Sequence, residues 1–341
     1  MMAQNIYNMT QVDGNWNNIP NHFDCFLIAG GSDCRAYEVL KKAKSDNVKI
    51  DNVYFFDFDE RKKGINKKFK DAYNEYQKLG FNINKISCSI QDPSACIKSL
   101  PKLGIDFSKH EQPAIDISCF TKPYFYLILK HMQLINKFSS ISVFYSEPKS
   151  YVFPKGLFSS YQSSIGPLNI LEIPGYSGSD VRGQKRILVI LLGFDGDLSR
   201  EINEDVAPSE TFIVNGFPGY APKFKDISLI CNERLIQEKN SEINYCRANN
   251  PFETFNLLET LKKDEKLQSR YGNFFMNIAP LGTKPMALGA CLFAIHNPEV
   301  RIVYPMPENY IKVTTDNSWK SWVYSIPLMI RNLGHFGVGP R

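Results

Sequence analysis

Three neighbouring residues, Gly282, Thr283 and Lys284, form a turn whose chemistry suits an anion. An apolar run that begins at residue 274 predicts a buried strand before the turn, and an Ala- and Leu-rich run at 286–295 predicts a buried helix after it. A turn between a strand and a helix gathers backbone N–H groups around one point, here beside a hydroxyl and an ammonium. The sequence therefore indicates a site for a phosphate-bearing ligand of nucleotide type. It names no ligand and establishes no catalysis.

The same pattern occurs earlier in the chain, where an apolar run precedes Thr121, Lys122 and Pro123. A Tyr-x-x-Pro-x-x-Tyr motif follows each copy, beginning at Tyr145 and at Tyr304. The threonines at 121 and 283 are separated by 162 residues, and the first tyrosines by 159. Two ordered matches at nearly the same separation predict an internal duplication.

Further glycines and polar residues follow the predicted strands. Glycine lets a ligand approach the backbone closely, and hydroxyl, ammonium and carboxylate groups can bind phosphate, ribose or a cation. In the first half of the chain the candidate ligand-binding residues are Gly30, Ser32, Asp33, Asp57, Asp59, Ser118, Thr121 and Lys122. In the second half they are Gly193, Asp195, Asp197, Gly282, Thr283 and Lys284. No catalytic residue and no metal ligand is assigned.

Each of these residues also has a purely structural interpretation. The glycines would serve tight turns, the threonines would cap helices, and the lysines and acidic strand ends would be solvated. Carboxylates repel a phosphate that has no counterion, so the acidic residues predict either contacts to ribose hydroxyls or a bound Mg²⁺. Mg²⁺ is thus the one cofactor left open.

Alternating strands and helices must position these residues. In both halves apolar strands end in glycine or polar loops and lead into helices, which predicts an α/β fold with two tandem Rossmann-like parallel-sheet domains. Ligands of such sheets bind at the carboxyl ends of the strands. The expected organisation is a polar lead-in at 1–22, a first repeat at 23–151, a connecting segment at 152–186, a second repeat at 187–312 and a C-terminal helix at 313–341. Within the connecting segment, residues 168–173 are expected to form an antiparallel strand.

Composition narrows the class of protein. The chain has 341 residues and a net charge of +5, which favours an anionic ligand but is too small to indicate a surface that binds duplex DNA. The eight cysteines form no C-x-x-C motif, so we expect free thiols in a reducing compartment. The polar N-terminus is unlike a signal peptide, and no apolar run is long enough to span a membrane. We therefore expect a cytoplasmic protein.

The segment Ala-Pro-Leu-Gly-Thr-Lys-Pro-Met-Ala at 279–287 resembles the Gly-Thr-Lys signature of CRISPR-associated Rossmann-fold (CARF) domains, which sense cyclic oligoadenylates. The resemblance covers this strand, turn and helix and the general strand order. It implies that Gly282, Thr283 and Lys284 face a ligand, together with the loop at 193–197. The first half departs from the signature because Phe120 stands where the motif has glycine, so the resemblance does not imply two equal sites.

Three functions are compatible with the sequence. The first is a sensor of a nucleotide-type ligand, such as a cyclic oligonucleotide, in a prokaryotic antiviral defence or signalling system with a protein partner encoded in the same operon. The second is an enzyme acting on nucleotides or on a cyclic-nucleotide messenger, although the chain has no P-loop and no G-x-G-x-x-G motif. The third is a scaffolding subunit of a defence complex. Whether the chain is an enzyme stays open.

Overall fold

Two mostly parallel sheets, each in its own unit, organise the chain. In the computed structural model, unit 1 comprises Met1–Tyr151 and Thr314–Arg341, and unit 2 comprises Val152–Val313. The structure describes residues 8–12, 16, 19–30, 35–58, 76–135, 138–152, 164–239, 242–310, 314–315 and 318–327. The α/β class with two Rossmann-like parallel-sheet domains, predicted from the alternating pattern, is confirmed.

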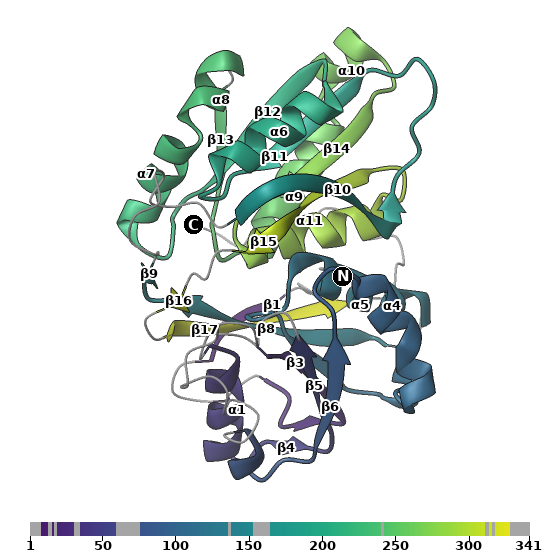
Figure 1. The fold of residues 1–341 in the computed structure, drawn as a ribbon, viewed down its shortest axis with the longest axis vertical. Coiled ribbons are helices and arrows are strands. Elements are labelled where there is room, and N and C mark those ends of the chain that lie inside the picture. The colour runs from purple at the N-terminus through teal and green to yellow at the C-terminus, as the bar shows by residue number, and fades with distance from the viewer. Residues whose placement is uncertain are drawn as a thin grey trace, which may run out of the picture. The chain divides into compact units, whose positions relative to one another are not determined.

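Unit 2 contains a six-stranded sheet with the order β10-β15-β14-β11-β12-β13. Five strands are parallel, and β10 runs antiparallel to β15 at one edge. Helices α9 and α11 pack against each other, and α6 packs against α8 (Figure 1). The elements are β10 (Ser164–Ser177), β11 (Arg186–Leu191), α6 (Gly196–Val206), β12 (Glu210–Gly216), α7 (Pro222–Cys231), α8 (Glu233–Lys239), β13 (Ile243–Cys246), α9 (Pro251–Lys262), α10 (Glu265–Tyr271), β14 (Phe275–Pro280), α11 (Lys284–His296) and β15 (Arg301–Tyr310).

Helix α11 is the most deeply buried helix of the described part of unit 2. All its residues from 285 to 295 are buried, as expected for a helix that is apolar on every side. It approaches α9 closely at Gly289, where a side chain would collide with the carbonyl oxygen of Pro251 and would lie 2.7 Å from Cβ of Thr254. Helix α11 is therefore held in place by the core of unit 2.

Unit 1 contains a seven-stranded sheet with the order β1-β17-β8-β7-β3-β5-β6. The five strands from β8 to β6 are parallel, and β17 runs antiparallel to both β8 and β1. The elements are β1 (Asn8–Gln11), β2 (His22–Phe23), β3 (Cys25–Ala29), α1 (Arg35–Ser45), β4 (Lys49–Ile50), β5 (Val53–Phe58), β6 (Ile83–Cys88), α4 (Pro93–Ser99), two short 3-10 helices η2 (Leu100–Leu103) and η3 (Phe107–Lys109), β7 (Pro113–Asp116), α5 (Lys122–Ile135), β8 (Ser140–Pro148), β16 (Thr314–Thr315) and β17 (Ser318–Pro327). The short strand β9 (Tyr151–Val152) pairs with β16 in a separate sheet.

The two sheets share one strand order. Counted along the chain, the five parallel strands of each unit lie in the order 3-2-1-4-5, followed by an antiparallel strand beside the fifth. Thr121 and Thr283 both follow the fourth strand, β7 or β14, and both precede a helix. The two threonines therefore lie at corresponding places, which supports the internal duplication.

A second repeated pattern supports the same conclusion. Cys88 ends β6 and Cys246 ends β13, and each is followed four residues later by a helix cap, Asp92 or Asn250. The side chain of Asp92 accepts the N–H of Ala95 at 2.9 Å, and that of Asn250 accepts the N–H of Phe252 at 3.0 Å. A proline follows each cap at the first helical position, where it needs no hydrogen-bond donor.

The antiparallel strands are exchanged between the repeats. In chain order β10 follows the strands of the first repeat but pairs with β15 of unit 2, whereas β17 follows the second repeat but pairs with β8 of unit 1. The strand expected at 168–173 is confirmed as part of β10, so the segment at 152–186 contributes to a sheet and is more than a connection.

The helix expected at 313–341 is wrong, because residues 318–327 form β17. The segment is rich in aromatic and β-branched residues and has a buried Val323 and Tyr324, and it ends in Pro327. Such a composition suits a strand flanked by two neighbours better than a helix. The remainder of the expected helix, residues 328–341, lies outside the described residues.

Val323→Ala should destabilise unit 1, although residue 323 follows unit 2 in the chain. Val323 is buried in the core of unit 1 beside Ala114 and Phe144, so its truncation should cost about 2 kcal/mol of unfolding free energy. Hydrogen exchange should then show lost protection in β7 and β8. Val303→Ala is the matched control, because Val303 is buried in the core of unit 2 and should deprotect β11 and β14. Loss of protection in β11 or β14 caused by Val323→Ala would contradict the strand exchange.

Candidate functional site

The carboxyl edge of the unit 2 sheet brings together loops that follow β11, β12, β13 and β14. Parallel strands end at one edge, so these loops are neighbours although they are far apart in sequence. A side chain at Gly193 would lie 2.5 Å from the carbonyl oxygen of Leu281. A side chain at Gly282 would lie 3.2 Å from the carbonyl oxygen of Leu192. The two predicted glycines therefore let the loops after β11 and β14 pack backbone to backbone.

Thr283 is the N-cap of α11. Its Oγ1 accepts the N–H of Met286 at 3.3 Å and donates a short hydrogen bond to the carbonyl oxygen of Ala248, in the loop after β13. Tyr220, in the loop after β12, donates its hydroxyl to the same carbonyl at 3.1 Å. The capping interpretation of Thr283 is thus confirmed, and the Ala248 carbonyl, which accepts from both hydroxyls, joins three loops of the edge.

Unlike the Thr283 hydroxyl, the backbone N–H groups of Gly282 and Thr283 have no hydrogen-bond partner among the residues that the structure describes. Pro285, the second residue of α11, has no N–H, and that of Met286 is already bonded to Thr283. The positive end of the helix dipole and two N–H donors thus lie beside the half-buried Lys284. This is an arrangement that can accept an anion.

The two predicted aspartates of the β11 loop have different environments. Asp195 is buried and caps α6, accepting the N–H of Leu198 at 3.4 Å. Asp197 is exposed, and its Oδ1 lies 3.8 Å from Nη2 of Arg200 one turn along the helix. Burial, and after it the charge of Asp197, raises the pKa of Glu201 above its ordinary value. Asp195 therefore serves the fold, and Asp197 is the carboxylate of this loop that solvent reaches.

The sequence pattern did not indicate that aromatic side chains are exposed at this edge. Phe217 follows β12 and Tyr245 lies in β13, with exposed fractions of 50% and 46%. Their ring centroids are 6.1 Å apart, and Nζ of Lys225 lies 5.0 Å from the first and 5.7 Å from the second. We call these three residues the Phe217 cluster. Exposed rings beside a cation can stack against a nucleobase and attract its phosphate.

The loop that carries Phe217 is anchored to the rest of the edge. The N–H of Phe217 donates to the carbonyl of Cys246 at 2.7 Å, and Pro218 accepts the N–H of Ala248 at 3.1 Å. Exposure of the rings results from their place near the outer strand of the sheet. A sequence pattern could mark the loop but could not show that its ring is left uncovered.

The corresponding edge of unit 1 is filled. Phe120, at the place of Gly282, is fully buried and its ring centroid lies 5.1 Å from that of Phe56. Ser118 is also buried, and its hydroxyl accepts the N–H of Ser146 at 2.8 Å. The hydroxyl of Thr121 is buried and has no hydrogen-bond partner in the described part of the chain. Unit 1 therefore has a threonine at this place but not the glycine before it. Among the described residues, Thr121 also lacks a hydrogen bond like the one that Thr283 makes to a neighbouring loop.

The remaining candidates of unit 1 are positioned as follows. The N–H of Gly30 donates to the carbonyl of Phe56 at 2.7 Å, which ties the end of β3 to β5. The carboxylate of Asp57 pairs with Lys85 at 2.8 Å. Lys122 begins α5 and is half-buried. Ser32, Asp33 and Asp59 lie outside the described residues.

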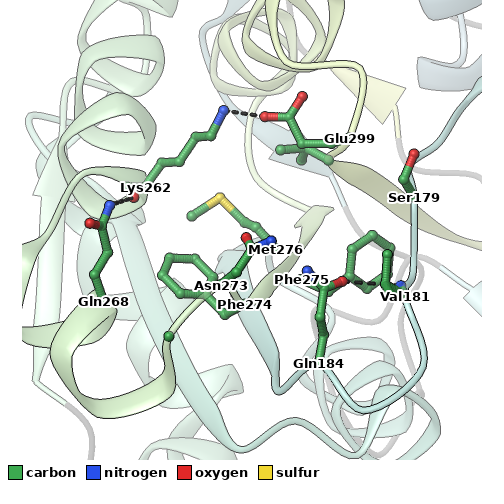
Figure 2. A pocket seen from close by; sticks show the side chains of 12 residues that line it. Ser179, Val181, Gln184, Lys262, Gln268, Asn273, Phe274, Phe275, Met276 and Glu299 are labelled. Carbon is green, nitrogen blue, oxygen red and sulfur yellow. Dashed lines mark hydrogen bonds and ion pairs between the residues drawn. The ribbon is translucent and has the colours of Figure 1, made fainter.

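A cavity of about 620 Å³ lies at the opposite end of the unit 2 sheet, where β14 begins (Figure 2). Phe274 and Met276 contribute apolar surface, and Lys262 forms a short ion pair with Glu299 at its rim. The sequence did not mark these residues. Since ligands of parallel sheets bind at the carboxyl ends, we take the edge around Gly282 as the candidate site and not this cavity.

Among the described residues, no cluster of three or more His, Cys, Asp and Glu side chains is placed to hold a metal ion. None of the helices in this part of the chain has the length and apolar character needed to cross a membrane.

Thr283→Ala should lower the unfolding free energy by about 1 kcal/mol or more, because it removes the cap of α11 and leaves the carbonyl of Ala248 with one donor fewer. Thr283→Ser should keep most of the stability. Thr260→Ala is the control, because Thr260 is exposed and its hydroxyl, within the described part of the chain, bonds only the carbonyl of Asn256 in its own helix. Chemical denaturation measures all three. Equal losses for Ala and Ser at 283 would show that the methyl group matters and the hydroxyl does not.

Comparisons with known proteins identify a fold but no family. No protein-family model matches the chain, and no curated protein does. A solved structure described as "Structure of a Type III CRISPR defence DNA nuclease activated by cyclic oligoadenylate" matches with a TM-score of 0.51 and 10% identity. The match covers 82% of this chain and 65% of that chain. An isoflavone reductase matches at a TM-score of 0.25, 12% identity and a coverage of 82% and 92%, too weak to carry an argument. At 10% identity the likeness to the nuclease concerns the fold alone.

Proposed function

We propose that this chain is a sensor that binds a nucleotide-type ligand, such as a cyclic oligonucleotide, in a prokaryotic antiviral defence or signalling system. The ligand would bind at the carboxyl edge of the unit 2 sheet. The observation that carries the proposal is the turn before α11, where the N–H groups of Gly282 and Thr283, beside Lys284, have no hydrogen-bond partner among the described residues. A phosphate would accept hydrogen bonds from both N–H groups and would be attracted by the ammonium of Lys284.

The likeness of fold supports the choice of ligand. The structure that matches is described as a CRISPR defence nuclease activated by cyclic oligoadenylate. Cyclic oligoadenylates are therefore the first ligands to test here, ahead of linear oligonucleotides and mononucleotides. In the proposed system the chain would act in the cytoplasm, and a protein partner would receive the signal.

The Phe217 cluster supports a ligand with a base as well as a phosphate. Phe217 and Tyr220 are in one loop, and the hydroxyl of Tyr220 shares the Ala248 carbonyl with Thr283. One short network thus connects the loop with the exposed rings to the turn with the N–H groups. A nucleotide would place its phosphate at the turn and a base against Phe217 or Tyr245.

The two units would not contribute equally. Phe120 of unit 1 is fully buried and stands at the position that Gly282 has in unit 2. A bulky buried side chain at that point hinders a ligand from approaching the backbone. The main site would therefore lie in unit 2, and Lys122 would contribute less than Lys284.

Lys284→Ala should weaken binding of a cyclic oligoadenylate by about 1–3 kcal/mol, the scale of a charge-assisted hydrogen bond. Isothermal titration calorimetry with the full chain measures the effect, with and without a chelator to test for Mg²⁺. Lys122→Ala should have a smaller effect. Lys185→Ala, at the opposite end of the sheet just before β11, should have none. Unchanged affinity in both Lys284→Ala and Lys122→Ala would mean that the two turns are structural. Ligand conversion, seen by chromatography, would favour an enzyme instead.

Phe217→Ala should weaken the same binding by about 1–3 kcal/mol, the range for one base stacked on one aromatic ring. The melting temperature should change little, because the ring is half exposed. Ile230→Ala is the matched control, since Ile230 is an apolar side chain of α7 in the same unit with an exposed fraction of 69%. If both variants bind as tightly as the original chain, the Phe217 cluster is not part of the site.

A further inference from the structure

Cys88 and Cys96 form a close pair of thiols in unit 1. Their Sγ atoms are 2.7 Å apart, and both residues are buried. A disulfide bond is about 2.05 Å long, so a movement of less than about 1 Å separates the two sulfurs from a covalent bond. Both cysteines are free in the structure.

The local fold brings the two sulfurs together. Cys88 is the last residue of β6, and Cys96 lies in the first turns of α4. Asp92 caps that helix by accepting the N–H of Ala95 at 2.9 Å, and Pro93 fixes its first turn. The connection between the thiols is therefore short and held by its own hydrogen bond, so the pair needs no rearrangement of the chain to meet.

The corresponding place in unit 2 lacks the second sulfur. Cys246 ends β13 as Cys88 ends β6, but Thr254 of α9 takes the place of Cys96. The two residues are again in contact, with 3.3 Å between Sγ and Oγ1, and are again eight residues apart. Both repeats thus place a polar contact here, and only unit 1 makes it from two groups that can be oxidised.

The contact also shifts the pKa values of the two thiols in opposite directions. The hydrogen bond from Cys88 lowers the pKa of Cys96, whereas the same interaction raises the pKa of Cys88. The thiolate is the reactive form of cysteine, so this lowered pKa favours reaction at Cys96. The hydroxyl of Tyr124 lies close by and donates to the carbonyl of Ser89 at 2.6 Å, next to Cys88.

We propose that Cys88 and Cys96 are a redox modification site, where a hydroperoxide converts the two thiols into a reversible disulfide. The Cys96 sulfur attacks the outer oxygen of the hydroperoxide, the O–O bond breaks, and an alcohol or water leaves with a proton. The Cys88 sulfur then attacks the resulting sulfenic acid, the S–O bond breaks, and water leaves with the Cys88 proton. Two thiols are oxidised and one peroxide is reduced. Exchange with a small dithiol reverses the step.

The disulfide would fasten the end of β6 to α4 at the carboxyl edge of the unit 1 sheet. The disulfide would also affect Tyr124 of α5, because the Tyr124 hydroxyl donates a hydrogen bond to the carbonyl of Ser89 in the same loop. This assignment is independent of the ligand proposed for unit 2, since it rests on the sulfur pair alone.

Peptide mapping tests the proposal directly. Trypsin cleaves after Lys85 and Lys98, and the peptide at 86–98 contains Cys88 and Cys96 and no other cysteine. The folded, reduced full chain is treated with increasing hydrogen peroxide, denatured in an alkylating agent and digested. The peptide should become resistant to alkylation and lighter by two hydrogen atoms, and dithiothreitol should restore both alkylation sites. Cys246 should stay alkylatable throughout. A peptide that remains doubly alkylated, or that gains oxygen atoms on one sulfur without forming the bond, would overturn the proposal.

Cys96→Thr is the matched variant, because it gives unit 1 the pair that unit 2 already has. Circular dichroism checks that the variant folds. Its Cys88 should remain alkylatable at peroxide concentrations that close the disulfide in the original chain. If Cys88 becomes resistant to alkylation equally fast in Cys96→Thr, its partner is a different thiol and the assignment is wrong. The map of the original chain decides the question even if the variant does not fold.

Discussion

The backbone contact between Gly193 and Leu281 holds the candidate site together. It allows the loops after β11 and β14 to lie against each other with no side chain between them. Because α11 is buried along its length, the turn before it cannot shift without opening the core of unit 2. The N–H groups of Gly282 and Thr283 are thus held in place by packing before any ligand binds. A site formed in advance loses little conformational entropy on binding, which raises affinity without adding contacts.

The parts of this fold that depend on local pattern could be predicted from the sequence, and the parts that depend on distant neighbours could not. Apolar runs between glycine loops marked the parallel strands, and the capping role of Thr283 was one of two interpretations of its place between strand and helix. The segment at 318–327 was expected to be helical because it is apolar, and only its two neighbours, β1 and β8, make it a strand. The exposure of Phe217 and the pairing of Cys88 with Cys96 depend on which strand is outermost and on how a cap directs a helix.

The two units share a strand order but differ at several residues at the carboxyl ends of their strands. Gly282 corresponds to Phe120, and Thr254 corresponds to Cys96, while the strands and caps around them are retained. The Thr283 hydroxyl joins two loops, whereas that of Thr121 is buried without a partner among the described residues. Packing restricts substitutions at the end of a strand less than it restricts substitutions within the strand. Two units with the same strand order can therefore differ in their chemistry, because chemistry depends on the site residues and not on the fold.

β10 and β17 each cover the outer edge of a fifth strand, β15 in unit 2 and β8 in unit 1. A unit without its antiparallel strand would leave the outer edge of its fifth strand bare, and bare edges pair with other chains. Two identical copies could cover each other's edges by trading their last strands, as β10 and β17 do now. The tandem chain has the topology of such a swapped homodimer joined end to end. Because one chain carries both units, the exchange of β10 and β17 is a folding step within one molecule and not an association that depends on protein concentration.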